Sequence, residues 1–256
     1  MSTKADLKDV TFTIPVRFDT NDRVENVTLI VDYLNHHFDT NIIVMEEAKE
    51  QKFSFLSDKV KYHFVKTDDP NLHRTKCLND MAKISTTPII VNYDTDVLFK
   101  VPNYLGAADL IRNGSAEMVF PYEGPFMECA RVPYFERIRG SLSVDGIEKE
   151  ELHCNHPTSV GGSIFWSKST FMKIGMENQN FKSWGFEDNE RMSRASKLGV
   201  VIKRTSGILY HMSHQRLTDS TPKNDYYINN QREFNKVNSM SKNQLEEYIT
   251  NWSWLK

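Results

Sequence analysis

Short apolar runs rich in β-branched residues alternate with helical-period segments along the first half of the chain. The runs at 10–15, 41–45 and 60–65 have the length and composition of buried strands. Between the first two runs, four apolar residues recur at helical spacing: Val24, Val27, Val31 and Leu34. A strand, a helix and a strand in this order predict a right-handed βαβ unit and hence a parallel sheet.

The pattern becomes less regular toward the middle of the chain. A helix over 74–84 leads into the apolar run 89–93, and a helix at 102–113 and a strand at 118–121 follow. From 122 to 157 the periodicity weakens, and we expect an irregular excursion with one helix near 128–139. A strand and a helix at 159–175 come next, followed by a helix that ends at 198–199. Two short strands at 200–203 and 208–211 and a polar helical tail complete the chain. The glycine pair at 161–162 predicts close approach of another group to the backbone.

These elements predict one mixed α/β domain with a mainly parallel central sheet between helices. The 256 residues suffice for one large domain, and a formal net charge of -2 argues against nucleic-acid binding through bulk charge. Three cysteines without metal-ligand spacing are expected to be reduced thiols. No apolar stretch approaches the ~18 residues of a membrane span, and the start has no signal-like core, so we expect a cytoplasmic protein. The oligomeric state stays open.

A pair of acids follows the apolar run 89–93 directly. Asp94 and Asp96 therefore stand where a central strand ends, and open α/β sheets bind ligands at that edge. Two carboxylates held near one another are costly unless a cation or a sugar hydroxyl meets them. A hard divalent cation such as Mg²⁺ or Mn²⁺ suits their oxygens. The alternative interpretation is a solvated turn.

Acidic residues also gather after an indole at 184–190. An aromatic face beside a carboxylate suits a sugar, because the ring stacks and the acid accepts a hydroxyl hydrogen bond or serves as a general base. The alternative is that these acids only complement the dipole at the start of a helix.

Histidines and basic residues provide two further candidate sets. His211 and His214 follow a short strand, and neutral imidazole is a common metal ligand, although either could be an ordinary core or surface histidine. Four cations stand in loops or at helix starts beside predicted strand ends and could hold phosphate: Arg17, Arg23, Arg74 and Lys76. Ordinary surface charge is the alternative for at least one of them.

Taken in order, these segments resemble the inverting glycosyltransferases of the GT-A fold. The nearest likeness is to the β-1,4-galactosyltransferase family and to bacterial chondroitin-polymerase-type domains, and it covers about residues 12–237. Six segments carry it in the right order: 14–17, 73–79, 94–96, 161–168, 184–190 and 214–216. One such motif alone is a modest signal, but six in order are strong.

The resemblance implies a role for each matching residue. Asp96 and His214 would ligate Mn²⁺ or Mg²⁺, and His211 would join or replace a methionine ligand of that family. The nucleotide and donor side would be formed by Pro15, Arg17, Glu46, Arg74, Asp94 and Gly162. Asp188 would be the general base that deprotonates the acceptor hydroxyl. The surrounding sugar site would be formed by Trp184, Gly185, Phe186 and Glu187.

The implied protein is a single GT-A domain over 1–256. It would have a nucleotide-sugar-binding half at about 10–121, an acceptor-binding and catalytic half at about 122–237 and a helical tail at 238–256. Its reaction would move a hexose or N-acetylhexosamine from a UDP-sugar to a glycan hydroxyl with inversion, as in polysaccharide biosynthesis.

Two departures from the family pattern change the expected specificity. Ser159 stands where that family has a bulky tyrosine beside the donor's second carbon, so UDP-N-acetylgalactosamine should be accepted at least as well as UDP-galactose. Phe186 replaces a glycine and should narrow or reshape the acceptor site.

Two other function classes remain open at this point. A haloacid-dehalogenase-like phosphatase also runs an apolar strand into two acids, with the first, here Asp94, as nucleophile. That motif normally lies on the first strand, whereas here it follows the fourth. A sugar-binding relative without turnover is the second alternative, and the intact base candidate at Asp188 argues against it.

Overall fold

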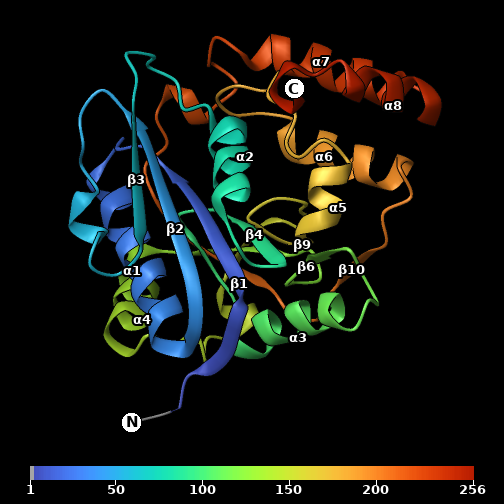
Figure 1. The fold of residues 1–256 in the computed structure, drawn as a ribbon. Helices are drawn as coiled ribbons and strands as arrows, with labels where there is room; N and C mark the ends of the chain where they lie inside the picture. The colour runs from blue at the N-terminus through green and yellow to red at the C-terminus, as the bar shows by residue number, and fades with distance from the viewer. Residues whose placement is uncertain (1–2) are drawn as a thin grey trace.

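A seven-stranded sheet forms the centre of the computed structural model, which describes residues 3–256 (Figure 1). The strands are β1 (Ala5–Val16), β2 (Phe38–Ala48), β3 (Lys61–Lys66), β4 (Ile89–Tyr93), β6 (Met118–Phe120), β9 (Ser163–Ser167) and β10 (Ile202–Arg204). Their order is β10-β6-β9-β4-β1-β2-β3. Only β9 runs antiparallel to its neighbours, β4 and β6, among these strands. The predicted mixed α/β domain with a mainly parallel sheet is confirmed.

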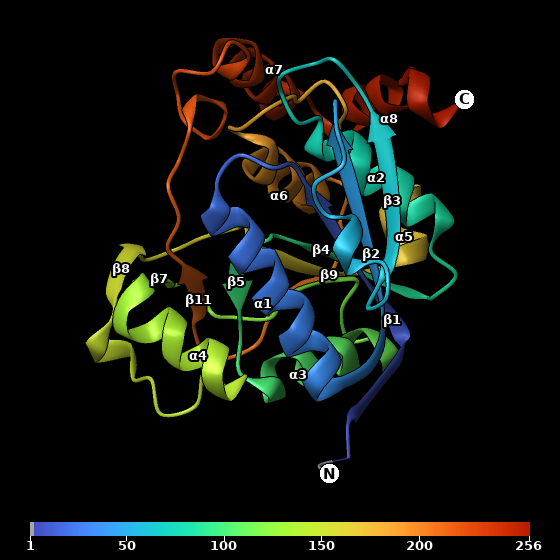
Figure 2. The same cartoon turned by 90° about the vertical axis from the view of Figure 1, so that its left-hand side faces the viewer.

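Helices cover both faces of this sheet (Figures 1 and 2). The longer ones are α1 (Asn21–His37), α2 (Arg74–Ile84), α3 (Val101–Arg112) and α6 (Glu187–Lys197), and α5 (Lys168–Lys173) is short. On one face, Tyr33 of α1 meets Tyr104 of α3 above Phe12 of β1. On the other face, α2 packs its apolar side onto β2, and Asn79 of α2 is hydrogen-bonded to the backbone of Glu177, between α5 and α6.

A second, four-stranded sheet was not predicted. It has the order β5-β11-β7-β8, formed by β5 (Val97–Leu98), β7 (Phe126–Cys129), β8 (His153–His156) and β11 (Leu209–Met212). The helix expected near 128–139 is wrong at its start, because 126–129 pairs in parallel with 209–212. Only α4 (Glu136–Ser141), after a π-helical turn at Arg131–Phe135, is helical there. The two paired strands are 83 residues apart in the sequence, as the contact between Glu128 and His211 shows. Local periodicity therefore does not reveal their pairing.

The chain ends in two helices packed over α6 (Figure 1). They are α7 (Tyr227–Ser239) and α8 (Lys242–Thr250), so helix begins before residue 238. Val237 and Leu245 are fully buried where these helices dock.

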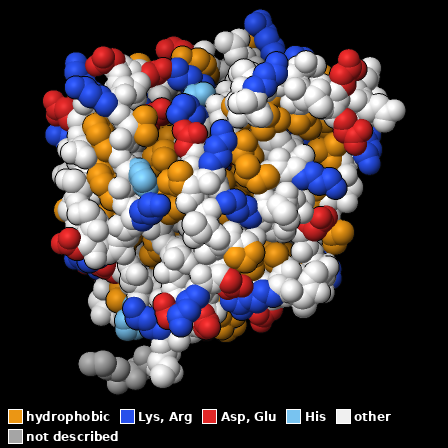
Figure 3. Space-filling view, viewed as in Figure 1, with side chains coloured by type: hydrophobic (Ala, Val, Ile, Leu, Met, Phe, Trp, Pro, Cys, Tyr) orange, Lys and Arg blue, Asp and Glu red, His pale blue; other side chains and the backbone are white. Residues whose placement is uncertain are grey.

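The surface carries interspersed acids and bases with apolar side chains between them on the face drawn in Figure 3. All three cysteines are free thiols, as expected. Within residues 3–256, no helix has both the length and the apolar character needed to cross a membrane.

Candidate functional site

A cavity of about 500 Å³ opens where β1 and β4 end. It collects residues from segments that are far apart in the chain, and most of the sequence-predicted site residues line it: Pro15, Arg17, Arg74, Asp94, Asp96, Gly162, Trp184, Glu187, Asp188, His211 and His214. The strand-end placement explains this gathering, because the carboxyl ends of parallel strands share one edge of a sheet.

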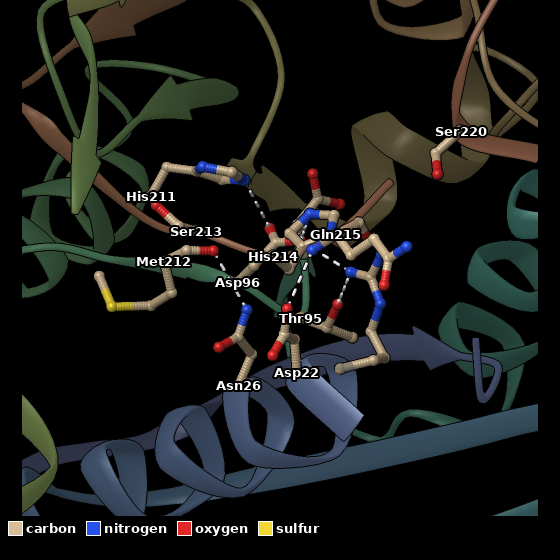
Figure 4. A network of polar contacts seen from close by, with 12 residues as sticks. Asp22, Asn26, Thr95, Asp96, His211, Met212, Ser213, His214, Gln215 and Ser220 are labelled. Carbon is tan, nitrogen blue, oxygen red and sulfur yellow. Dashed lines mark hydrogen bonds and ion pairs between the residues drawn. The ribbon is translucent and has the colours of Figure 1, made fainter. Parts of the chain in front are cut away.

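Three potential metal ligands meet on one side of the cavity (Figure 4). One ligand atom from each of Asp96, His211 and His214 lies within 4.8 Å of the other two. His214 Nε2 is 3.1 Å from Asp96 Oδ2, and His211 Nε2 is 3.9 Å from Asp96 Oδ1. A carboxylate with two imidazoles fits a transition-series divalent cation such as Mn²⁺ better than Mg²⁺, which favours oxygen ligands.

The backbone around these ligands is fixed by pairing with distant elements. Met212, between the two histidines, donates its N–H to the Asp96 carbonyl at 2.7 Å and accepts from Asn26 Nδ2 of α1 at 3.1 Å (Figure 4). His211 also stands opposite Val97 in the β5–β11 pair. The two histidines and Asp96 are therefore held by the second sheet and by α1 together.

Glu128 of β7 contacts a candidate metal ligand, and the sequence analysis did not single it out. Its Oε2 lies 2.8 Å from His211 Nδ1, and its Oε1 accepts a hydrogen bond from Ser213 Oγ. A carboxylate on one ring nitrogen orients the imidazole so that the other nitrogen faces the metal position. Burial raises the pKa of Glu128, but its hydrogen bond with His211 and the charge of that ring outweigh burial and lower the pKa to about 2. This contact depends on the β7–β11 pairing, which no local pattern predicts.

Asp96 is held as an anion in the cavity wall. Burial raises its pKa, but the hydrogen bond from His214 and the charges of His211 and Arg23 together hold the pKa well below its usual range. Arg23 Nη1 donates to Asp96 Oδ2 at 2.7 Å and to Thr95 Oγ1 at 2.6 Å. Arg23, a candidate phosphate ligand from the sequence, thus pairs with the candidate metal ligand in this structure.

A second charged cluster lies on the opposite side of the Asp94–Asp96 turn. Arg74, at the start of α2, forms an ion pair through Nη2 with Asp94, and its Nη1 is 3.8 Å from Asp188 Oδ1. Burial raises the pKa of Asp94; the guanidinium of Arg74 opposes this, whereas the nearby carboxylates of Asp96 and Asp188 add to it. Arg74 therefore connects the acid pair after β4 to the first turn of α6.

The glycine pair makes room for this cluster. A Cβ on Gly161 would overlap the Asp188 carboxylate at Oδ2, and one on Gly162, whose φ is +80°, would overlap Leu209. The predicted close approach to the backbone is confirmed, and one of the approaching groups is the candidate base itself. Gly161 thus fixes how near Asp188 can lie to β9.

Trp184 and Glu187 line the cavity beside Asp188. The indole of Trp184 is 37% exposed and stacks on Tyr227 with ring centroids 6.0 Å apart, so one of its faces is covered by protein. Glu187 Oε2 accepts the Gly185 N–H at 2.8 Å. Burial and the adjacent charge of Asp188 raise the pKa of Glu187 to about 7.

We expect Glu187→Gln to stabilise the metal-free protein in a pH-dependent way. A carboxyl whose pKa is raised in the folded state costs no stability below its ordinary pKa; the cost grows as the pH rises and is complete above about pH 7. The variant should match wild type near pH 4.5 and be more stable at pH 8 by at most about 3 kcal/mol. Chemical denaturation at several pH values measures the difference, and a stability difference independent of pH would contradict the assignment.

Two predicted site residues lie elsewhere. Glu46 does not line the cavity: its buried carboxylate accepts the backbone N–H groups of Lys52 and Phe53 and the Tyr62 hydroxyl, so it closes a loop and is not available to a nucleoside. The Phe186 side chain packs on α7, against Tyr227 and Phe234. It therefore does not narrow the cavity, because its left-handed φ of 68° places it on the far side of the turn.

Two further candidates, Lys76 and Gly185, do not line the cavity. Lys76 pairs with Asp80 along α2 and does not line the cavity. Gly185 contributes only its backbone N–H, to Glu187. Arg17 does line the cavity and is held by the backbone carbonyls of Glu47 and Asp69, at 2.6 and 2.8 Å.

Comparisons with known proteins agree with this geometry. Residues 144–215 match the family described as the N-terminal domain of galactosyltransferase, a segment that contains Asp188 and both candidate histidine ligands. The catalytic domain of Drosophila β1,4-galactosyltransferase 7, solved with xylobiose, superposes with a TM-score of 0.56 at 16% identity, covering 91% of this chain and 82% of that one. The chain has a GT-A glycosyltransferase fold. No curated protein sequence matches it.

A second solved GT-A structure is more distant. The mannosyltransferase PcManGT from Pyrobaculum calidifontis, in complex with GDP-mannose and Mn²⁺, gives a TM-score of 0.50 at 14% identity, covering 81% of this chain and 58% of that one. The GT-A fold removes the support for the phosphatase alternative, whose acids belong on a first strand. Here Asp94 follows β4 and is paired with Arg74.

Proposed function

We propose that this protein is a Mn²⁺-dependent inverting glycosyltransferase that moves a sugar from a UDP-sugar to a hydroxyl of a glycan. One observation carries the proposal: the Asp96–His211–His214 cluster and the carboxylate of Asp188 line the same cavity. Arg74 forms ion pairs with both Asp188 and Asp94, and Asp94 stands two residues before Asp96. A cation site and a carboxylate in one cavity suit transfer from a diphosphate leaving group.

The binding roles follow from the side chains on each side of the cavity. Asp96, His211 and His214 would hold the cation, which when bound supplies Lewis-acid stabilisation of the charge on the departing diphosphate. Arg17 and Arg74 add positive charge on the nucleotide side, where guanidinium groups suit phosphate oxygens. The exposed face of Trp184 offers an apolar platform for a sugar ring.

The chemistry is a single displacement in which Asp188 takes the proton. The acceptor hydroxyl oxygen forms its bond to the anomeric carbon while its proton passes to the Asp188 carboxylate. The bond between that carbon and the UDP oxygen breaks, and its electron pair leaves with UDP. Attack from the face opposite the leaving group inverts the anomeric centre, so no covalent enzyme intermediate is needed. Glu187, with its pKa near 7, serves as a hydrogen-bonding partner for sugar hydroxyls.

Ser159 supports a donor with a substituent at the second carbon. Its side chain lines the cavity, and its backbone carbonyl accepts from Arg204 Nη2 at 2.7 Å, which fixes the loop before the glycine pair. A hydroxymethyl group here occupies far less space than the tyrosine of the β-1,4-galactosyltransferases. The donor we propose is therefore UDP-galactose or UDP-N-acetylgalactosamine, with the second accepted at least as well.

A donor panel tests both the activity and this preference. With Mn²⁺ and xylobiose or other β-glycosides as acceptors, we expect UDP release from UDP-N-acetylgalactosamine to be at least as fast as from UDP-galactose, and no release with EDTA. Ser159→Tyr should slow the N-acetylated donor selectively. Nucleotide binding without any turnover would favour the sugar-binding alternative, and turnover only with unsubstituted sugars would reject the role of Ser159.

A further inference from the structure

Beneath the first turn of α6, a buried arginine joins Asp188 to a buried glutamate. The side chains of Arg191 and Glu177 are each only 1% exposed. Arg191 Nε donates to Glu177 Oε1 at 2.7 Å and to Oε2 at 2.9 Å, and Arg191 Nη1 donates to Asp188 Oδ1 at 2.6 Å. Arg191 follows Asp188 by one helical turn, so both side chains lie on the same face of α6.

Glu177 is in turn fixed to the central sheet and to α2. Asn92 of β4, two residues before Asp94, donates from Nδ2 to Glu177 Oε1 at 2.6 Å. Asn79 of α2 pairs with the Glu177 backbone in both directions, at 2.8 and 2.9 Å. The contacts run without a gap from the strand that presents Asp94 to the carboxylate of Asp188.

Anchoring of α6 alone does not account for this arrangement. Burying ions is costly, and replacing a buried ion pair by apolar residues is often neutral or stabilising. The same helix already has a second buried ion pair, that of Arg194 with Glu190. Arg194 Nε is 2.8 Å from Glu190 Oε1, and Arg194 Nη1 donates to the Ile174 carbonyl. That pair makes no contact with Asp188 and does not line the cavity. What distinguishes Arg191 is its contact with the candidate base.

We propose that Arg191, held by Glu177, is a positioning residue that fixes the Asp188 carboxylate through Oδ1 and leaves Oδ2 to receive the acceptor proton. The proposal rests on the proposed function, because it assumes that Asp188 is the base. Both guanidinium groups near the base, Arg191 and Arg74, face Oδ1. Oδ2 instead lies close to Gly161 and has no hydrogen-bond partner among residues 3–256.

The bidentate reach of arginine is essential to this role. Its planar guanidinium contacts Glu177 through Nε and Asp188 through Nη1 at the same time, whereas the single ammonium of lysine is a point charge. Arg191→Lys should therefore keep a cation beside Glu177 and lose the contact with Asp188. Arg194→Lys is the matched control, with the same substitution, helix and burial but no contact with the base.

The test compares these variants with the donor and acceptor pair that the panel selects. We expect Arg191→Lys to lower kcat by about 10-fold or more, because small misplacement of a reacting group can cost up to ~10²-fold. KM for the donor and Mn²⁺-dependent UDP binding should stay close to wild type. The acid limb of kcat against pH should move to higher pH, because a positive charge moves away from the base. Arg194→Lys should reproduce the wild-type kcat and pH profile even if it is equally destabilised.

Three outcomes are decisive. Equal kcat and equal pH profiles for the two lysine variants would overturn the positioning role. Should Arg191→Lys fail to fold, Glu177→Gln replaces it in the test. This variant keeps an oxygen acceptor for Arg191 but weakens the ion pair that holds the guanidinium. A wild-type kcat in Glu177→Gln would also overturn the positioning role. If Asp188→Asn itself keeps full activity, the proposed function has failed, and that result is distinguishable from a failure of positioning alone.

Discussion

Replacing Asp188 by asparagine should lower kcat for sugar transfer by roughly 10²–10⁴-fold, the range typical of a lost general base. The amide has almost the same shape as the carboxylate, so it still fits against Gly161 and can still accept from Arg191 Nη1 at its oxygen. Mn²⁺-dependent UDP binding should stay intact, because the candidate metal ligands lie on other elements. UDP release and calorimetric UDP binding separate the two effects.

The same helix supplies a control for that substitution. Glu190→Gln also changes a buried carboxylate to an amide two residues along, but Glu190 pairs with Arg194 and does not line the cavity. It should lose stability and keep kcat, provided that the measurement is made on folded protein. Transfer by Asp188→Asn at a rate near wild type would show that another group takes the proton, with Glu187 the nearest alternative in sequence.

The residues that sequence reasoning placed correctly share one property. Asp94, Asp96 and the glycine pair are located by the strand ends beside them, and strand ends are local features of the pattern. Because the ends of neighbouring strands share one edge of a sheet, local features were enough to bring these residues to one cavity. The order of six short motifs then added the α6 acids and the histidines, which are not on the same strand edge.

The residues that were missed or misplaced depend on tertiary contacts. Glu128 faces His211 only because two distant strands pair, and Arg191 of α6 contacts Glu177 only once the segment before α6 packs against that helix. Phe186 shows the reverse error: it is adjacent to the site in sequence, but its positive φ directs the ring to α7. Glu46 follows the strand predicted at 41–45, yet in the structure it lies inside β2, and the loop after β2 folds back and hydrogen-bonds its carboxylate.

The two sides of the cavity differ in how their charge is balanced. On the side of the candidate metal ligands, Glu128 contacts His211, and one guanidinium, that of Arg23, pairs with Asp96. The base side has the opposite arrangement, with Asp94 and Asp188 sharing Arg74 and with Arg191 behind. Arg23 and His214 both contact Asp96 Oδ2, so a cation held through that oxygen would compete with the Arg23 guanidinium. Arg23 would then be free to face a phosphate group.

Removing that oxygen should abolish most of the metal dependence. Asp96 is the only carboxylate in the cluster, so Asp96→Ala would leave two imidazoles beside Arg23, whose remaining carboxylate partner is Asp19. We expect Mn²⁺-dependent UDP affinity to fall by at least about 10²-fold, beyond the 10–100-fold typical of changes to outer-shell partners. Titration of UDP by calorimetry with Mn²⁺ and with EDTA measures it, and the EDTA values should be similar for variant and wild type.

Release of Arg23 is the competing explanation for such a loss, and a neighbouring acid separates the two. Asp19 is the other carboxylate paired with Arg23, with Oδ2 at 3.1 Å from Nη2, and it does not belong to the ligand cluster. Asp19→Asn therefore weakens the hold on Arg23 without removing a metal ligand, and UDP affinity should still respond to Mn²⁺. If Asp19→Asn loses the response as fully as Asp96→Ala, the guanidinium and not the carboxylate controls it. Unchanged Mn²⁺ dependence in Asp96→Ala would mean that the cation is held elsewhere.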